Sequence, residues 1–301
     1  MEIIKEPIHY QNPLLFIKVW QFEQTVDELT LTAEEIASGV QKVKWHHHKE
    51  VEFIVVQQGT HQMQTPNQVY TLAQDEVIVI GSSQLHRSIS RIQEKLVYIV
   101  LHVDLEAYFH VAMMRYFRHF SEVNQPLERL NYIFQENKEV QRQVAQLIRN
   151  IHEEMMNKAG GYEIATVMYI KHLMLVLLRG DTKGLLQPHE LIDPNVMKPV
   201  LEYVEEHLGD SIDLQQVSDI AGMSYFYFSK YFKKAMGSTF VDYVNRKRIA
   251  KAERLLVTST YKITDIARMV GIESMTHFYN LFKRMNGCTP KQYLQKIDGE
   301  R

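Results

Sequence analysis

An internal duplication near the C-terminal end constrains this chain more than any other feature. Residues 217–237 read VSDIAGMSYFYFSKYFKKAMG, and residues 266–287 read IARMVGIESMTHFYNLFKRMNG. When the two copies are aligned from Ser224 and Ser274, both contain the pattern Phe-x3-Phe-Lys-(Lys/Arg)-x2-Gly. Agreement at this many positions in a single register predicts two copies of one structural unit.

Each copy has the pattern of a helix-turn-helix. Apolar residues recur at helical spacing before a glycine, Gly222 or Gly271, which allows the backbone conformation of a sharp turn. Ser224 and Ser274 follow these glycines, and serine is a favoured N-cap residue. The sequence therefore predicts a second helix in each copy, over residues 225–236 in the first.

The second helix of each copy is predicted to bury one face and to present the other. In the first copy, Phe228 and Phe232 fall on the side opposite Phe226 and Lys230. A helix with a polar, cationic outer face after a tight turn can enter a major groove, where lysine and asparagine reach base edges. Solvated charges on an ordinary amphipathic helix would explain either copy alone. The duplication favours DNA reading, because a helix over residues 241–256 could hold both copies against successive segments of one duplex.

The C-terminal region, residues 193–296, resembles the DNA-binding domain of the AraC/XylS family of bacterial transcription regulators. Besides the repeats, the resemblance rests on the motifs Arg248-x3-Ala252-x2-Leu255-Leu256 and Gly287-x-Thr289-Pro290-x2-Tyr293. It implies binding to double-stranded DNA and contact with RNA polymerase, and it favours activation. Base-facing positions implied by the resemblance are Phe226, Ser229, Lys230, Met275, Thr276, Tyr279 and Asn280. The cationic side chains suited to phosphate contacts are Lys233, Lys234, Lys283 and Arg284.

The N-terminal part has the pattern of a small β-barrel. Short apolar runs separated by turn signals recur between about residues 43 and 103, as in barrels and jelly rolls. Within them, His46-x-His48-x3-Glu52-x6-Gly59 matches the first sequence motif of cupins, and His86 stands where the second motif places its histidine. Residues 1–104 therefore resemble the cupin-like sensor domain that is common in this regulator family.

These four polar residues, His46, His48, Glu52 and His86, form what we call the histidine cluster. Side chains alternate along a strand, so His46, His48 and Glu52 are expected on one side of it, with His86 reaching them from a neighbouring strand. Three histidines and one carboxylate suit a divalent metal such as Zn, Mn, Fe or Ni. The same groups could instead bind sugar hydroxyls or a small acid, or form only a polar rim of the barrel. We predict them as ligand-binding residues and as candidate metal ligands.

Two apolar helices are predicted after the barrel, over residues 140–156 and 162–178. Together they carry more apolar surface than a small barrel can cover on one side, which favours a homodimer interface. Packing within one chain is the alternative. Gly, Pro and polar residues between positions 180 and 195 then indicate a linker.

Charge and composition are consistent with this division. From Pro194 onward the chain carries 16 lysines and arginines against 12 aspartates and glutamates, whereas the preceding residues carry 18 against 24. A mildly basic C-terminal part is compatible with DNA binding. No apolar run approaches the ~20 residues that span a bilayer, and the N-terminal MEIIKEP lacks the pattern of a secretion signal. The single cysteine, Cys288, fits a reducing cytoplasm, where we expect the protein to act.

The sequence thus predicts an α+β fold with four regions. These are a cupin-like β-barrel over 1–104, a helical dimerisation segment over 105–180, a linker over 181–193, and an all-α domain with two helix-turn-helix motifs over 194–301. We expect a transcription regulator that responds to a small-molecule effector, and the family resemblance favours a carbohydrate or another metabolite. No catalytic motif is found, so the protein is not expected to be an enzyme. The rival hypothesis is a metal-dependent cupin enzyme or a metal-sensing regulator that uses the histidine cluster.

Overall fold

The computed structural model describes residues 4–12, 14–24, 39–66, 68–91, 95–109, 113–120, 126–187, 193–286 and 288–298. Linker residues 188–192 and the second-copy glycine Gly287 lie outside this description. The chain forms two compact units. The N-terminal unit comprises Met1–Tyr108 and His119–Gln187, and the C-terminal unit comprises Phe109–Arg118 and Pro188–Arg301.

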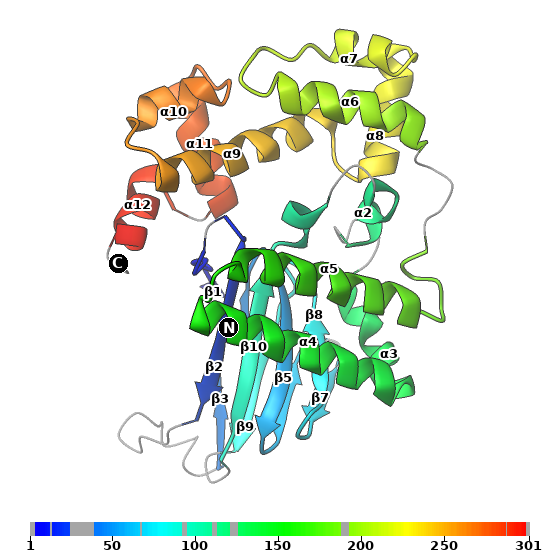
Figure 1. Ribbon diagram of the computed structural model, residues 1–301, viewed down its shortest axis with the longest axis vertical. Helices are drawn as coiled ribbons and strands as arrows, with labels where there is room; N and C mark the ends of the chain where they lie inside the picture. Colours follow the sequence, from blue (N-terminus) through cyan, green and yellow to red (C-terminus); the bar gives the residue numbers. More distant parts are fainter. Residues whose placement is uncertain are drawn as a thin grey trace. The chain divides into compact units, whose positions relative to one another are not determined.

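Short strands, bounded by the turn signals in the sequence, build the first part of the N-terminal unit (Figure 1). They are β1 (Ile4–Lys5), β2 (Ile17–Glu23), β3 (Val40–Lys42), β4 (His46–His47), β5 (Val51–Gln58), β6 (His61–Gln64), β7 (Val69–Leu72), β8 (Val77–Ile80), β9 (Arg87–Arg91) and β10 (Val97–Val103). Two four-stranded antiparallel sheets result, ordered β2-β10-β5-β8 and β3-β9-β6-β7, while β1 pairs with β4 in parallel.

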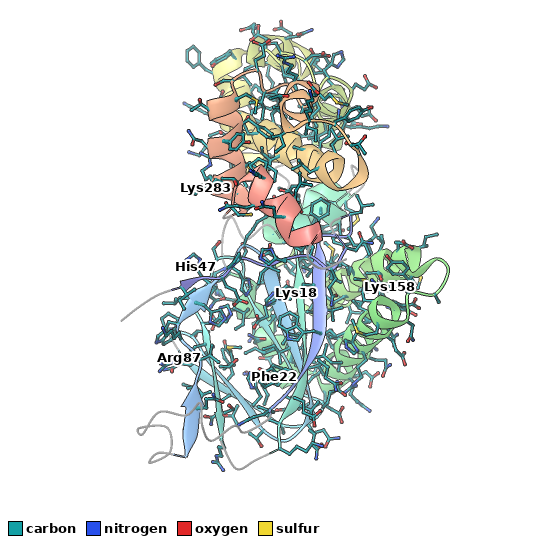
Figure 2. All side chains as sticks on the ribbon, turned by 90° about the vertical axis from the view of Figure 1, so that its left-hand side faces the viewer. Lys18, Phe22, His47, Arg87, Lys158 and Lys283 are labelled. Atoms are coloured by element: carbon teal, nitrogen blue, oxygen red, sulfur yellow. The ribbon has the colours of Figure 1, made fainter. Side chains whose placement is uncertain are left out.

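The two sheets enclose one apolar core, because alternate side chains of each strand point inward. Its buried members are Ile54, Val56, Met63, Tyr70, Leu72, Ile78, Ile80, Leu96, Tyr98 and Val100. Strand β10 lies between β2 and β5, and its residue Val103 is opposite both Ile17 and Val51. Every residue of β10 is buried, as expected for a central strand covered on both faces. Figure 2 shows Lys18 and Phe22 along β2, the strand at the edge of this sheet.

Helices cover the β2-β10-β5-β8 sheet on its outer side (Figure 1). After β10 the described elements are the 3₁₀ helices η2 (Leu105–Tyr108) and η4 (Leu127–Leu130), then α3 (Asn131–Glu136), α4 (Lys138–Asn157) and α5 (Tyr162–Gly180). Helix α4 packs on the sheet and on α5. The helix predicted over residues 140–156 is confirmed as α4, and its buried residues form one apolar stripe that includes Val144, Leu147, Ile148, Ile151 and Met155.

The C-terminal unit is helical throughout its described elements. They are α2 (Met114–Phe120), most of which belongs to this unit, and α6 (Pro194–Glu206), α7 (Leu214–Ile220), α8 (Tyr225–Met236), α9 (Phe240–Thr258), α10 (Ile263–Met269), α11 (Met275–Asn286) and α12 (Pro290–Asp298). Both predicted helix-turn-helix motifs are present, as α7–α8 and α10–α11. The Ser224 hydroxyl accepts a hydrogen bond from Tyr227 N at 3.4 Å, and the Ser274 hydroxyl accepts one from His277 N at 3.3 Å, which confirms both predicted caps.

Each helix-turn-helix has its own core, and α9 belongs to both. Phe240, Tyr243 and Val244 of α9 pack with Phe228 and Phe232 of α8. Further along α9, a second set packs with α10, α11 and α12, and it consists of Ile249, Ala252 and Leu256. One continuous helix therefore joins the two motifs, as the sequence predicted. The α+β fold with an N-terminal barrel and two C-terminal helix-turn-helix motifs is confirmed.

Candidate functional sites

The outer face of α8 is exposed and carries aromatic and cationic side chains. Phe226 is 77% exposed, and Lys230, Lys233 and Lys234 are also exposed, whereas Ser229 is half-buried. On the opposite face Phe228, Phe232 and Ala235 are buried. The predicted division of this helix into a core face and an outer face is therefore confirmed, and Gly222 makes the preceding turn with φ +65°.

The outer face of α11 is more polar than that of α8. Thr276, Asn280, Lys283 and Arg284 are exposed. Lys283 projects from the outer side of the helix (Figure 2). The two remaining predicted positions, Met275 and Tyr279, are half-buried and pack against the second core.

Arg248, which the sequence reading used only as a motif residue, joins α9 to the segment that follows α6. Arg248 of α9 donates a hydrogen bond from Nε to the carbonyl of Leu208 at 3.1 Å and another from Nη2 to the carbonyl of Asp210 at 2.6 Å. A Cβ added to Gly209 would lie 2.9 Å from the carbonyl oxygen of Met269, so the chain after α6 packs closely on the turn of the second motif. The spacing of the motif residues gives no local signal for these contacts, because Arg248 lies 40 and 38 positions from its partners and Gly209 lies 60 positions from Met269.

In the N-terminal unit the structure brings the histidine cluster together inside the barrel. The nearest ring nitrogens of His46, His48 and His86 lie within 4.8 Å of one another. The Glu52 carboxylate lies beside them, with its Oε2 at 3.2 Å from His48 Nε2 and 3.7 Å from His86 Nε2. His48, His86 and Glu52 are buried, while His46 is half-buried and its Nε2 lies 3.5 Å from a Glu6 carboxylate oxygen.

Backbone carbonyls orient three of the four residues. The Nδ1 atoms of His46, His48 and His86 lie 2.9, 3.0 and 2.8 Å from the carbonyl oxygens of Lys44, Glu50 and Gln84. His46 and His86 also face each other across an isolated β-bridge, which explains how residues 40 positions apart meet. This antiparallel bridge between the segments of His46 and His86 could not be deduced from the spacing of the motif residues.

A fourth histidine, His102, belongs to this site and was missed by the sequence reading. The register of β10 against β5 places it opposite Glu52, and its Nε2 is 2.5 Å from Glu52 Oε2. His102 is buried and packs edge-on against Trp20. Its only sequence signal is a histidine within an otherwise apolar strand, which identifies a buried polar group without naming its partner.

The electrostatics of the site centre on Glu52. Burial would raise the pKa of this carboxyl, but the charge of His86 and the hydrogen bonds from His102 and His48 hold its pKa well below the usual range. Burial lowers the pKa of His86, yet the Glu52 carboxylate outweighs that effect and the pKa is raised. At His102 burial dominates and the pKa is lowered, and at His46 burial and the charge of His86 lower it. A buried, ionised carboxylate among imidazoles is a site suited to a cation.

Two known families match the two units described above. The AraC-like ligand binding domain matches residues 36–170, and the helix-turn-helix domain found in such regulators matches residues 217–296. The protein is thus of the class that joins a cupin-like sensor domain to a pair of helix-turn-helix motifs. The chain belongs to the AraC/XylS family of transcription regulators.

Three relatives illustrate how the similarity is distributed. Regulatory protein PocR of Salmonella typhimurium is 37% identical over 111 residues, which cover 37% of this chain and 35% of PocR. The xylose operon regulatory protein of Escherichia coli K12 is 34% identical over 103 residues, which cover 34% of this chain and 26% of that protein. The transcriptional activator RhaS of Shigella sonnei is 25% identical over 257 residues, which cover 84% of this chain and 88% of RhaS. The chain thus spans only about a third of PocR and about a quarter of the xylose regulator.

Among the described residues, no helix combines the length and the apolar character needed to cross a membrane.

Proposed function

We propose that this protein is a sequence-specific DNA-binding transcription regulator whose barrel domain binds a small-molecule effector. The observation that carries this proposal is the pair of capped helices, α8 and α11, joined through α9 and each presenting an exposed polar face. A helix of this kind after a tight turn is the standard means of reading a major groove. Family membership supports the same function.

The exposed faces of α8 and α11 carry two kinds of side chain, one suited to bases and the other to phosphates. Lys230 and Asn280 occupy equivalent positions of the two copies, and their side chains suit guanine and adenine edges respectively. Phe226 offers an apolar surface to a thymine methyl group. The cationic pairs Lys233–Lys234 and Lys283–Arg284 are exposed in the last turns of their helices, where they would contact phosphates.

The names of the relatives support finer features of the proposal. RhaS is described as an activator, so we propose activation, with contact to RNA polymerase in the cytoplasm. The xylose operon regulator makes a carbohydrate one class of effector to test. We place no catalytic step in the barrel, because a regulator needs only that the effector bind one arrangement of the protein better than another.

We also propose that two copies of the chain pair through α5. Ile164, Met168 and Leu175 recur at helical spacing on this helix, and their side chains are 77%, 55% and 38% exposed. An exposed apolar stripe of this kind is costly in water and is a common feature of interfaces between subunits.

Replacing Ile164 and Met168 together by aspartate should convert the dimer into a monomer, because two charges would be buried in an apolar contact. Light scattering coupled to size-exclusion chromatography measures the mass. Gln146→Asp, on the exposed face of α4, is the matched charge control and should leave the mass unchanged. A wild-type chain that is monomeric at every concentration would contradict the pairing.

Selection of binding sites from a pool of random duplexes tests the function itself. The expected result is enrichment of two short sequence elements separated by about one helical turn, ~10 base pairs, because two linked reading helices contact successive major-groove segments. The selected duplex should bind ~10³-fold or more tighter than an unrelated one, with affinity that falls as salt rises. A pool that stays random after selection would contradict sequence-specific reading.

A further inference from the structure

The hydrogen bonds of the histidine cluster fix which nitrogen of each ring is free. A backbone carbonyl can only accept a hydrogen bond, so the Nδ1 atoms beside the carbonyls of Lys44, Glu50 and Gln84 carry the protons. In a neutral ring the other nitrogen, Nε2, then has a free lone pair. The Nε2 atoms of His48 and His86 point to the Glu52 carboxylate, and ring nitrogens of all three histidines converge. Histidines that bind metals are usually oriented in this way, by a hydrogen bond from the second ring nitrogen.

When the three rings are neutral, the converging nitrogens and the Glu52 carboxylate are all acceptors, which is unfavourable unless a cation lies among them. His86 Nε2 is buried and has no hydrogen-bond partner among the described residues. The carboxylate of Glu52 adds negative charge at the same point. When the other rings are neutral, its Oε2 accepts a hydrogen bond from His102 alone among the described residues. Such an arrangement of buried lone pairs costs free energy in isolation and is satisfied by one positive ion.

The separation of the candidate ligand atoms suits a metal ion. Within each of the two groups, His46–His48–His86 and His48–Glu52–His102, the candidate atoms lie within 4.8 Å of one another. An ion fits among atoms at this separation, because metal–nitrogen and metal–oxygen bonds are about 2.0–2.2 Å long.

We propose that His46, His48, His86 and Glu52 bind a divalent transition-metal ion of the kind that prefers imidazole, such as Zn²⁺ or Ni²⁺, and that this ion is an effector of the regulator. The second part rests on the proposed DNA-binding function, whereas the first does not. His102 is a positioning residue: its Nε2–H donates to Glu52 and holds the carboxylate toward the three imidazoles. Because three of these side chains and His102 are buried in the barrel, occupation of the site can bias the fold of the sensor domain.

The test of the site uses the full chain, stripped of metal and titrated with Zn²⁺, Ni²⁺ and Co²⁺. Bound metal is counted by elemental analysis, and Co²⁺ is followed by its visible absorption, which reports nitrogen and oxygen ligands directly. His86→Asn is the sharpest variant, since the asparagine amide can still donate to the Gln84 carbonyl while the Nε2 ligand is lost. We expect one ion per wild-type chain and an affinity reduced more than ~100-fold in His86→Asn and Glu52→Gln.

Two controls separate loss of a ligand from loss of structure. His47→Ala changes the histidine between His46 and His48, which belongs to neither converging group, and it should keep wild-type affinity. His102→Ala should weaken binding about 10–100-fold, and His102→Gln should restore it, because the glutamine amide reproduces the Nε2 donor. A wild-type chain that binds none of the three ions, or a His86→Asn chain that binds as tightly as wild type, overturns the metal site.

The effector role is tested by DNA affinity measured with and without the ion that binds, on the duplex selected as described above. A change of about fivefold or more that is absent in His86→Asn supports it. Metal that binds the cluster while DNA affinity stays the same overturns the effector role and leaves the site intact. Absence of DNA binding in all conditions contradicts the regulator, and the metal count is unaffected by that result.

Discussion

The two helix-turn-helix copies share one plan, yet they differ in how their turns are packed. In the first copy the turn glycine, Gly222, has open space where a side chain would begin. In the second copy a Cβ on Gly271 would lie 2.8 Å from the carbonyl oxygen of Leu208 and 3.0 Å from a nitrogen of Arg248. Both glycines have positive φ, +65° and +77°. The turn of the second motif is therefore packed against the segment after α6 and against Arg248 of α9, whereas the turn of the first motif has open space beside its glycine.

The outer faces of α8 and α11 differ as well. Tyr225, Phe226 and Tyr227 begin α8 and are all exposed, at 41%, 77% and 60%. The equivalent positions in α11 are Met275, Thr276 and His277, of which the last two are exposed polar residues. The caps and core positions are alike in both copies, because they are needed for folding. The surfaces have diverged, and this is expected if the two helices read different base sequences.

The largest expected difference concerns the turn glycines. Gly222→Ala should cost only the penalty of a left-handed backbone with a Cβ, about 1–2 kcal/mol. Gly271→Ala adds a clash with backbone atoms that cannot rotate away, and it should cost ~3 kcal/mol or more in total. Native-state hydrogen exchange on the full chain measures the local free energy of opening for each motif separately.

Equal protection losses in the two alanine variants would show that the contact between Gly271 and Leu208 is not formed in solution. A larger loss of protection in Gly222→Ala than in Gly271→Ala would contradict the prediction that the second turn is the more tightly packed one. Arg248→Lys tests the same contact, since lysine cannot donate to both carbonyls in the fork geometry of arginine.

The next difference concerns base reading. Lys230→Ala and Asn280→Ala should each weaken binding to the selected duplex by about 1–3 kcal/mol, and each should relax base preference in its own half of the site. Competition with duplexes that carry single base changes measures this. Glu202→Ala changes an exposed residue of α6, outside both reading helices, and this control should leave base preference unchanged. If both variants lost preference in the same half, the assignment of one helix to each half would be wrong.

The smallest expected difference concerns the caps of the first helices. Asp213 caps α7 by accepting a hydrogen bond from Gln215 N at 3.1 Å, whereas Lys262 stands at the N-cap of α10 and makes no such bond. Lys262→Asp should therefore stabilise α10 by about 0.5–1 kcal/mol, through the cap and the helix dipole. Asp213→Ala should destabilise α7 by about 1 kcal/mol. Hydrogen exchange of the amides in each helix measures both changes in stability. If Lys262→Asp left α10 unchanged, another group would already accept hydrogen bonds from the N–H groups of its first turn.

Much of the C-terminal unit could be predicted because its signals are local. A glycine at the turn, a serine after it and phenylalanines four residues apart determine a capped amphipathic helix within about twenty residues. The structure confirms these caps and the buried faces of α8 and α11. It also places Met275 and Tyr279, which the family resemblance assigned to the base-facing side, half-buried against the core.

The histidine cluster was predictable only in part. The spacing of His46, His48 and Glu52 indicated side chains on one side of a strand, and the cupin resemblance added His86. His102 could not be found in this way, because its meeting with Glu52 depends on the register between β5 and β10. A shift of that register by one residue would turn the His102 side chain to the opposite face of the sheet.

The sequence by itself determined the helices, caps and turns of the two motifs, since these depend on residues that are neighbours along the chain. It also determined that polar groups gather in an otherwise apolar barrel. Only the tertiary structure decided which ring nitrogens of the histidine cluster face one another and that His102 orients the Glu52 carboxylate. It also decided that the turn glycine Gly271 is closely packed, whereas the equivalent Gly222 has open space beside it. Those features arise from contacts between segments far apart in sequence, and such contacts leave no periodic pattern in either segment.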